Sequence, residues 1–297
     1  MMSNQKHNIR FAFFGTSHIA VCVFDALLDA GFVPALVVTL PEKTKGRGLI
    51  SHPTAVEIHA SERGIPVAHD WSAFEKSPPM GGWDVAIVVD YGKILPKRIL
   101  DIPIKGFLNV HPSLLPRLRG PSPMRSAILH DEHETGVSII LVDEEMDHGP
   151  IVAQKKIAVP EWPVKNSELE TLLIPEGGRL LAQILPEYVA GNIEPREQNH
   201  DLATVSDKFS KEDGLLDLKA DAYQNLLKIK AFEGWPGTFT FFERPSIGSG
   251  QEAKKIRVQI IEAHVDGAGL ILDTVKPEGK REMPYADFIR SGAKIAL

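Results

Sequence analysis

Apolar and polar positions alternate in a regular order along the first two thirds of the chain. Residues 9–14 are apolar apart from Arg10, a Gly-Thr-Ser turn follows, and residues 19–30 carry apolar side chains at helical spacing up to Gly31. Strands that alternate with helices predict an α/β fold with a doubly wound, mostly parallel, Rossmann-like sheet. We expect strands at 33–39, 65–67, 84–89, 106–110, 137–142 and 151–157, and helices at 53–63 and 167–189.

The pattern changes after residue 190. Residues 191–206 are polar, contain a proline and show no periodicity, so we interpret them as a linker. Beyond them, one amphipathic helix is followed by short strand-like segments separated by glycine and proline turns, which predict a small β-barrel. We expect those segments at 237–242, 255–263, 269–272 and 285–289, and hence an α/β domain over 1–190 and a second domain over 207–297.

Composition narrows the class of protein. The chain has 297 residues, 43% of them apolar and 24% charged, as in ordinary soluble globular proteins. No apolar run approaches the roughly 20 residues needed to span a bilayer, so we expect no membrane segment. The single cysteine, Cys22, excludes an internal disulfide and fits a reducing compartment, which predicts a cytoplasmic protein. Its place in the first helix predicts a buried thiol.

Several common chemistries lack their motifs. The first strand-turn-helix offers only Gly15 where a dinucleotide fold would have GxGxxG, and neither GxxxxGKS nor GxxxxGKT occurs. Nicotinamide and nucleoside-triphosphate chemistry are therefore disfavoured. Residues 130–134, HDEHE, do not match the HExxH spacing of zinc enzymes, and we interpret them as a solvated helix end. We expect no metal.

A polar pair ends the strand predicted at 106–110. Asn109 and His111 stand two residues apart and therefore share one face of the strand, at the sheet edge where open α/β proteins bind ligands. Asp147 lies in a turn 36 residues beyond His111. An amide and an imidazole can donate to a developing oxyanion, and a carboxylate can orient the imidazole. The three predict an acyl-transfer site that needs an external nucleophile, since no serine or cysteine accompanies them.

These segments resemble a known family. NVHPSLLPRLRG, together with the downstream ETGVSIILVDEEMDHGPI, is similar to the signature of the 10-formyltetrahydrofolate-dependent formyltransferases, and FFGTSHIA resembles their opening strand and turn. VDYGKILP resembles the segment that lines the folate pocket in this family. The resemblance implies 10-formyltetrahydrofolate as formyl donor, no metal, and a folate pocket formed by Asp90, Tyr91, Gly92, Ile94, Leu95, Ser113, Leu114, Leu115 and Pro116.

The rest of the chain indicates one branch of that family. KFSKEDGLLDL, AFEGWPGTF and KPEGKREMPYADFIRSG resemble the linker end and the C-terminal OB-like, tRNA-binding domain of methionyl-tRNA formyltransferases, with that domain shortened here between Ala263 and Leu270. TLPEKTKGRG resembles the loop that enters the tRNA acceptor arm, which implies phosphate contacts from Lys43, Lys45 and Arg47. The family commonly has arginine where this chain has Lys43.

The resemblance implies a reaction and its partners. A formyl group would move from 10-formyltetrahydrofolate to the amino group of initiator methionyl-tRNA, with Asn109 and His111 as donors to the formyl oxygen. Asp147 would orient His111 and accept the proton of the amine. We expect a monomer. Two alternatives remain open: a nucleotide-linked amino-sugar N-formyltransferase, which would not need the basic loop, and a catalytically idle RNA-binding adaptor.

Overall fold

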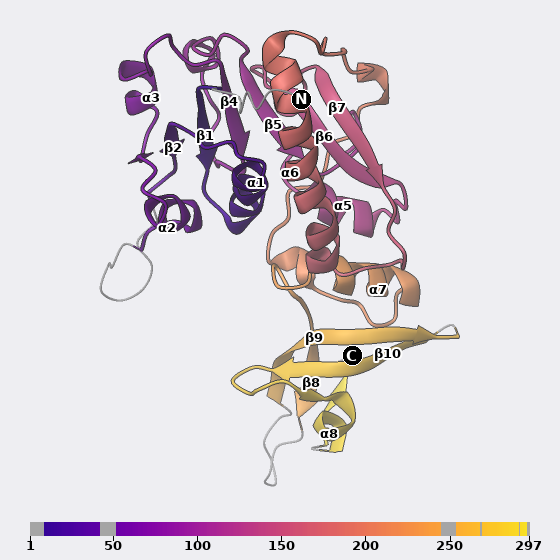
Figure 1. Ribbon diagram of the computed structural model, residues 1–297. Coiled ribbons are helices and arrows are strands. Elements are labelled where there is room, and N and C mark those ends of the chain that lie inside the picture. The colour runs from indigo at the N-terminus through magenta and orange to yellow at the C-terminus, as the bar shows by residue number, and fades with distance from the viewer. Residues whose placement is uncertain (1–8, 42–51, 245–253, 268, 291, 296–297) are drawn as a thin grey trace. The chain divides into compact units, whose positions relative to one another are not determined.

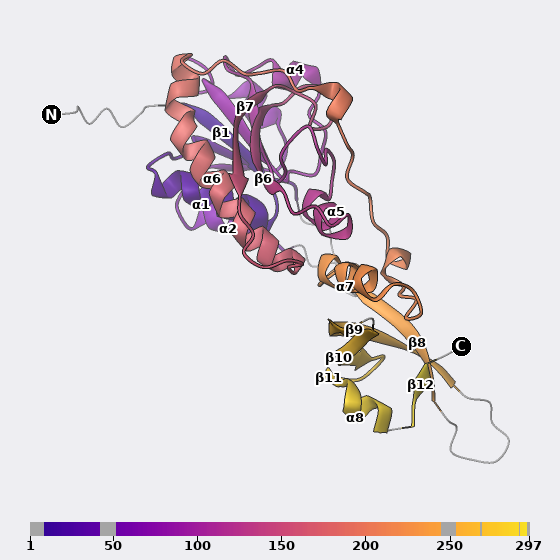
Figure 2. The same cartoon turned by 90° about the vertical axis from the view of Figure 1, so that its right-hand side faces the viewer.

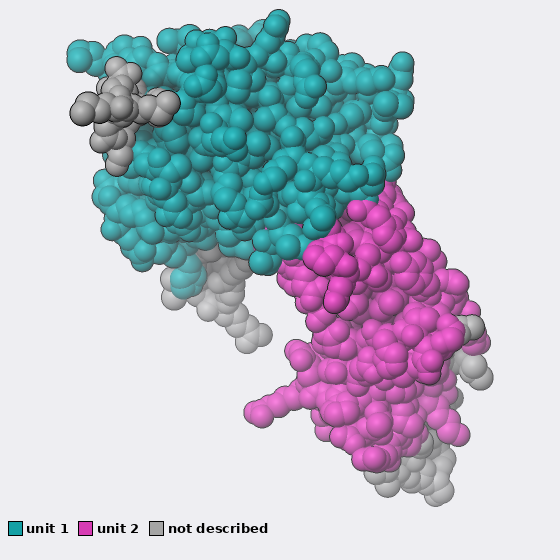
Figure 3. Space-filling model, turned by 45° about the vertical axis from the view of Figure 1, so that its right-hand side comes forward, with its two compact units in different colours: residues 1–120, 134–158, 171–205 teal, residues 121–133, 159–170, 206–297 magenta. Residues whose placement is uncertain are grey.

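The computed structural model describes residues 9–41, 52–244, 254–267, 269–290 and 292–295. Contacts between residues divide the chain into two compact units (Figure 3). Unit 1 comprises residues 1–120, 134–158 and 171–205, and unit 2 comprises residues 121–133, 159–170 and 206–297. Each unit therefore draws on segments that are far apart in the sequence.

A seven-stranded sheet forms the centre of unit 1 (Figure 1). Its strand order is β3-β2-β1-β4-β5-β6-β7, parallel from β3 to β5 and antiparallel from β5 to β7. The predicted mostly parallel α/β sheet is thereby confirmed. The strands are β1 (Phe11–Gly15), β2 (Leu36–Val38), β3 (Val67–Ala68), β4 (Val85–Val89), β5 (Phe107–His111), β6 (Thr135–Leu141) and β7 (Ile151–Ile157).

Helices cover both faces of this sheet because its strands alternate apolar side chains between the two sides. On one face lie α1 (His18–Asp29), α2 (Ala55–Ser61) and α6 (Asn166–Ala190). Phe13 of β1 stacks on Phe24 of α1 there, with ring centroids 4.9 Å apart. In α6, a Cβ at Gly178 would lie 2.7 Å from the Cβ of Ala26, so α1 and α6 pack side by side (Figure 1, Figure 2).

The opposite face of the sheet carries an aromatic core. Phe14 of β1 packs edge-on against both Phe74 and Phe107, with centroids 5.1 and 5.2 Å apart. Two short helices close this face, α3 (Ser72–Lys76) and α4 (Lys97–Leu100). Asn109 and His111 have the same strand parity as Phe107, so their side chains emerge on this face rather than beneath α1 and α6.

Cys22 corrects one expectation from the sequence. The buried positions of α1 are Ala20, Val23, Phe24 and Leu27, which form one stripe at helical spacing. Cys22 falls on the other side of the helix and is exposed. The prediction of a buried thiol is therefore wrong.

Unit 2 contains a five-stranded antiparallel sheet with the order β11-β10-β9-β8-β12. Within the described residues β11 and β12 are its two edges, so the predicted barrel is an open half-barrel. The strands are β8 (Thr238–Arg244), β9 (Lys254–Asp266), β10 (Gly269–Pro277), β11 (Met283–Pro284) and β12 (Lys294–Ile295).

The helices of unit 2 correct a second expectation. The expected strand at 285–289 is wrong, because these residues form helix α8 (Tyr285–Arg290) and bury one side chain, Phe288, against the sheet core. The unit also contains α5 (Pro123–Leu129), the short 3-10 helix η2 (Glu212–Gly214) and α7 (Ala222–Ala231).

Residues 191–205, which we expected to be a linker, belong to unit 1. Arg196 forms an antiparallel bridge with Ile151, and Val205 forms a parallel bridge with Arg119. The segment includes the short 3-10 helix η1 (His200–Leu202). Its polar side chains therefore have partners within the unit, which an aperiodic sequence does not reveal.

Two further features concern the described ranges alone. None of their helices has the length and apolar composition that crossing a membrane requires. They also contain no group of three or more His, Cys, Asp or Glu side chains placed to hold a metal ion.

In the HDEHE segment, Asp131 accepts hydrogen bonds from Trp162 Nε1 and from the Tyr223 hydroxyl, at 2.6 and 2.9 Å.

Candidate active site

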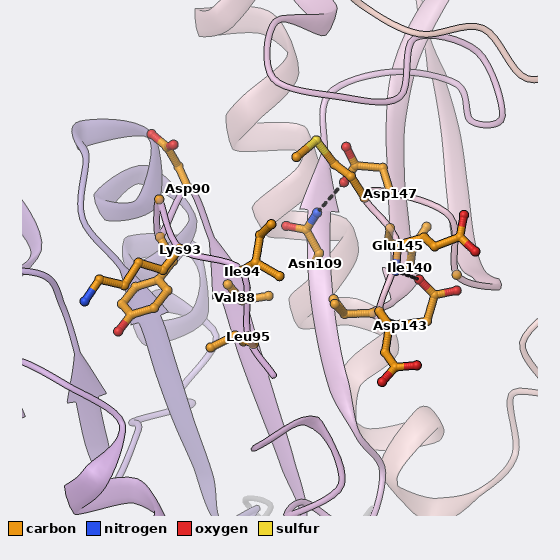
Figure 4. A pocket seen from close by; sticks show the side chains of 16 residues that line it. Val88, Asp90, Lys93, Ile94, Leu95, Asn109, Ile140, Asp143, Glu145 and Asp147 are labelled. Carbon is orange, nitrogen blue, oxygen red and sulfur yellow. Dashed lines mark hydrogen bonds between the residues drawn. The ribbon is translucent and has the colours of Figure 1, made fainter. Parts of the chain in front are cut away.

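A cavity of about 400 Å³ opens at the carboxyl ends of β4 and β5 (Figure 4). It lies beside the point where the strand order reverses between β1 and β4, which is the usual position of ligand crevices in open α/β sheets. The lining comes from the end of β4 and the following loop, from β5, and from β6 with the hairpin loop to β7. These are residues 88, 90–95, 109, 140, 142–147 and 149.

Asn109 and Asp147 face each other in this cavity. The Asn109 Nδ2 donates to Asp147 Oδ1 at 3.3 Å, as the dashed line in Figure 4 marks. Asp147 Oδ2 accepts a hydrogen bond from the backbone N–H of Gly120 at 2.8 Å. An amide nitrogen carries two protons, so Asn109 can donate one to Asp147 and the other to a ligand.

The hairpin loop between β6 and β7 brings Asp147 to this position. Leu141 N donates to Pro150 O at 2.9 Å and closes the loop. Gly149 approaches β6 so closely that a Cβ there would lie 1.9 Å from Leu141 O, which requires glycine. Asp147 itself adopts a left-handed φ of 52°. The loop thus turns back over the sheet with its carboxylate directed at β5.

His111 lies behind Asp147 and is only 4% exposed. Its Nε2 lies 2.9 Å from the carbonyl oxygen of Leu118. Because a carbonyl only accepts, Nε2 must carry the proton. The other ring nitrogen, Nδ1, lies 3.5 Å from Asp147 Oδ2. His111 is not among the cavity-lining residues, so in this arrangement its ring contacts Asp147 rather than the space where a formyl group would lie.

Four non-glycine residues among those described have a left-handed φ; Asp131 is in unit 2, and the other three line the cavity or contact a residue of the proposed site. Asp90, Leu118 and Asp147 have φ values of 43°, 58° and 52°, in the left-handed region that residues other than glycine rarely occupy. Asp90 begins the loop after β4, Leu118 binds His111, and Asp147 faces Asn109. Such strain persists where surrounding contacts enforce it, and functional sites are a common location.

Acidic side chains dominate the cavity electrostatically. The lining carries one cation among its described residues, Lys93. Five carboxylates line the same space: Asp90, Asp143, Glu144, Glu145 and Asp147. Tyr91 also contributes, and burial, with a smaller contribution from the charge of Asp70, raises the pKa of its phenol to about 12. The lining therefore favours a cationic ligand group and disfavours an anionic one unless a hydrogen-bond donor is supplied.

The structure separates the residues that the resemblance assigned to folate into two groups. Asp90, Tyr91, Gly92, Ile94 and Leu95 line the cavity. The residues from Ser113 to Pro116 do not.

The loop carrying the second group is fixed to the sheet instead. Ser138 Oγ donates to Ser113 O at 2.7 Å and accepts from Leu115 N at 3.1 Å. Leu115 packs with Ile140 and Ile151, and the Leu114 side chain lies against Gly136. The contacts of Ser113, Leu114 and Leu115 therefore hold the start of this loop on the sheet, and the chain continues through Pro116 to Leu118 and Gly120.

The cavity and its supports include residues that the sequence patterns did not indicate. Lys43, Lys45 and Arg47 lie outside the described residues. The acidic stretch 143–146 lines the cavity, although only Asp147 was singled out from this motif. Gln198, from the segment expected to be a linker, donates to the backbone oxygen of Asp147 at 2.9 Å. Nothing in its aperiodic surroundings indicates that contact.

Known formyl transferases resemble this chain in sequence over most of its length. The chain matches a family model described as formyl transferase over residues 8–182. The methionyl-tRNA formyltransferase of Myxococcus xanthus is 36% identical, over 97% of this chain and 96% of that protein. The methionyl-tRNA formyltransferase of Thermus thermophilus is 38% identical, over 95% of this chain and 96% of that protein.

Solved structures show the same fold. A methionyl-tRNA formyltransferase from Clostridium thermocellum has a TM-score of 0.56 at 16% identity, covering 91% of this chain and 98% of that one. An N-formyltransferase from Helicobacter canadensis, in complex with folinic acid and dTDP-3-aminofucose, has a TM-score of 0.64 at 19% identity, covering 86% and 87%. From the family model and the curated relatives together, the chain belongs to the formyl transferase family and, within it, to the methionyl-tRNA formyltransferases.

Proposed function

We propose that this protein transfers the formyl group of 10-formyltetrahydrofolate to the amino group of initiator methionyl-tRNA. The observation that carries the mechanism is the convergence of Asn109, His111 and Asp147 beside one cavity, from two separate segments of the chain. The sequence similarity to methionyl-tRNA formyltransferases extends over nearly the whole chain and supports methionyl-tRNA as the acceptor.

The cavity suits a folate in size and lining. Its volume of about 400 Å³ is within the range of about 300–1,000 Å³ that is usual for small-molecule sites. Val88, Leu95 and Val142 supply apolar walls, while Asn109 and Asp147 supply polar groups at one end. We propose that Asp90, Tyr91, Gly92, Ile94 and Leu95 form the wall against the pteridine ring.

Activation of the nucleophile requires little of the protein. An α-amino group has a pKa of about 8, so a useful fraction is neutral near pH 7. The carboxylates of the cavity attract the cationic form and hold it near the formyl carbon. Asp147 is the carboxylate that accepts from Asn109, and we propose that it takes the proton that the amine loses on attack and passes it to N10 of the folate as the bond between N10 and the formyl carbon breaks.

The larger barrier is the negative charge that develops on the formyl oxygen. Among the proposed catalytic side chains, Asn109 is the one that offers an N–H to the cavity. One such donor contributes on the order of 10²- to 10³-fold in rate. We propose that His111, whose Nε2–H donates to Leu118 O, holds Asp147 through an Nδ1–H when both ring nitrogens carry a proton, and does not act as a second donor to the oxygen.

The test is a formylation assay with three acceptors and 10-formyltetrahydrofolate as donor. The acceptors are charged initiator tRNA, charged elongator methionine tRNA and a nucleotide-linked amino sugar. We expect the added mass of one formyl group on initiator methionyl-tRNA. Formylation of the amino sugar alone would contradict the proposal, and so would the absence of any formylated product.

A further inference from the structure

Gln198 is almost fully enclosed beside the Asp147 turn. The residue is 4% exposed and lies in the segment 191–205, far in sequence from the cavity. Its Nε2 lies 2.9 Å from the backbone oxygen of Asp147 and 2.7 Å from that of Gly149. Its Oε1 lies 3.1 Å from Arg119 Nε and 2.7 Å from Arg119 Nη2. Both ends of one buried amide are thus in use.

Chemistry fixes the orientation of this amide. The two backbone oxygens only accept hydrogen bonds, so they require the NH₂ end of Gln198. The guanidinium of Arg119 only donates, so it requires the oxygen end. No other orientation satisfies all four contacts.

The contact with Asp147 is made at a strained backbone position. Asp147 has a φ of 52°, and a non-glycine residue in that conformation costs of order 1–3 kcal/mol unless its surroundings enforce it. Gln198 binds the carbonyl of Asp147 and the carbonyl two residues further on, and so spans the turn. The carboxylate of the same residue is bound separately by Gly120 N and Asn109.

Arg119, which binds the side-chain oxygen of Gln198, is itself fixed by further hydrogen bonds. Its backbone N–H donates to Thr204 O at 2.9 Å, and Leu118 N donates to Thr204 Oγ1 at 2.8 Å. Its Nη2 also lies 2.8 Å from His200 Nδ1. The loop that provides Gly120 N to Asp147 and the segment that carries Gln198 are therefore held together by backbone and side chain alike.

We infer that Gln198 is a positioning residue for formyl transfer. It holds the Asp147 turn so that the carboxylate stays opposite Asn109, and it acts through its NH₂ group rather than by filling space. This inference rests on the proposed function, because its effect is on the step that uses Asn109 and Asp147. It does not require Gln198 to touch either substrate.

The experiment compares two substitutions that separate the ends of the amide. Gln198→Leu keeps approximate size and removes all four contacts. Gln198→Glu retains an acceptor for Arg119 but places a second acceptor against the carbonyls of Asp147 and Gly149. We expect kcat to fall about 10- to 100-fold in both variants, since displacements of about 1 Å have effects of that size. KM for folate and for tRNA should stay within about twofold of the wild-type values.

A control comes from the next residue. Asn199 is exposed, and its Oδ1 accepts from Asp201 N at 3.2 Å, away from Asp147. Asn199→Ala should retain wild-type kcat. Circular dichroism melts of all variants show whether they are folded at the assay temperature, and Gln198→Glu keeps its partner Arg119 if Gln198→Leu fails to fold.

The outcomes are distinct. Wild-type kcat in Gln198→Glu would overturn the inference, because it would mean that Arg119 alone needs the residue. A kcat in Gln198→Leu as high as that of Asn199→Ala would overturn it as well. An inactive wild-type protein in the same assay would instead contradict the proposed function.

Discussion

Asn109 and His111 are two residues apart on β5 yet have different surroundings. Asn109 lines the cavity and donates to Asp147, whereas His111 is buried between Asp147 and the carbonyl of Leu118. The period of two along a strand places both on one face, but it does not decide which side chain reaches the ligand. Replacing Asn109 and replacing His111 should therefore lower kcat by different amounts.

Asn109→Ala should lower kcat by about 10²- to 10³-fold, because it removes the proposed donor to the formyl oxygen. KM for tRNA should change little, since the side chain does not face nucleic acid in this mechanism. Steady-state kinetics with the tRNA and the folate varied in turn measure both quantities. A rise in the KM for tRNA with unchanged kcat would contradict the assignment.

His111→Ala should also lower kcat, but by less than Asn109→Ala, because it acts through Asp147. The matched comparison is His133→Ala, whose ring is exposed and pairs with Asp131 in unit 2. That control should leave kcat unchanged. Equal losses of kcat and of tRNA affinity in His111→Ala would count against a role limited to the chemical step.

Two buried tyrosines differ by one hydrogen bond. Burial raises the pKa of both Tyr91 and Tyr188 to about 12, with Asp70 contributing at Tyr91. The Tyr188 hydroxyl donates to Lys105 O at 2.7 Å, whereas the Tyr91 hydroxyl has no partner among the described atoms. At neutral pH, Tyr188→Phe should cost about 0.5–1.5 kcal/mol of unfolding free energy and Tyr91→Phe should cost nothing.

The same pair predicts a response to alkali. The unfolded phenol has a pKa of about 10, so the folded state retains these protons more tightly. The stability linked to them is complete below pH 10 and is lost as pH rises to about 12. Denaturant unfolding between about pH 9 and 12 covers both the unfolded and the folded pKa of these phenols. Over that range the unfolding free energy should decline less steeply with pH in either Phe variant than in the wild type. An unchanged slope in both would contradict the raised pKa values.

The elements show how far sequence patterns reach. β5 could be predicted because an apolar run ends at a proline, and the loop of Asp147 because its motif is distinctive. The helices α3 and α4 were not predicted, since five and four residues provide too little periodicity, and the seven-residue helix α5 was missed as well. In α8, aromatic and apolar residues in a short segment favoured a strand, but Phe288 is its one buried side chain.

Tertiary contacts explain what the patterns missed at the site. Gln198 and the loop residues 113–116 form their hydrogen bonds with partners more than 20 residues away in the sequence. Local sequence carries no record of such pairings.

The packing of α6 on the sheet gives a prediction at this scale. A Cβ at Gly177 would lie 2.5 Å from Val110 Cγ1, so Gly177→Ala forces β5 and α6 apart. Alanine favours a helix by about 1 kcal/mol over glycine, but overpacking typically costs about 1–3 kcal/mol. We expect a net loss of stability in denaturant unfolding.

The exposed residue Gln183 in the same helix provides the control. Gln183→Ala should change the unfolding free energy by less than about 0.5 kcal/mol. A higher unfolding free energy in Gly177→Ala would contradict this prediction, because α6 and β5 would then accommodate the added methyl group without strain.

Charge is unevenly divided over the whole molecule. From residue 205 onward there are 14 Lys and Arg against 14 Asp and Glu, so the preceding part carries the entire net charge of 33 − 39 = −6. A polyanionic tRNA must therefore be bound through local basic groups. The family resemblance implies Lys43, Lys45 and Arg47 for this role, and they lie outside the described residues.

Lys43→Ala should raise the KM for tRNA and leave kcat unchanged, since the side chain is proposed to contact phosphate and not the reacting groups. The slope of log(kcat/KM) against log salt should become shallower by about one. Initial rates over a range of KCl concentrations measure it, with Lys76→Ala on α3 as a charge-matched control. Parallel salt dependence in all three proteins would exclude a phosphate contact by Lys43.

The bridge between Arg119 and Val205 has a practical consequence for protein engineering. The chain leaves unit 1 after Gly120, after Ala158 and after Val205. Gly120 at the first exit donates its backbone N–H to Asp147, and the segment that ends at the third exit carries Gln198, which donates to the Asp147 carbonyl. By composition alone, residues 191–205 would be chosen for an epitope tag, a protease site or a split point. Their backbone instead supports the proposed catalytic site, so cutting or lengthening the chain there would disturb the hydrogen bonds that hold the Asp147 turn.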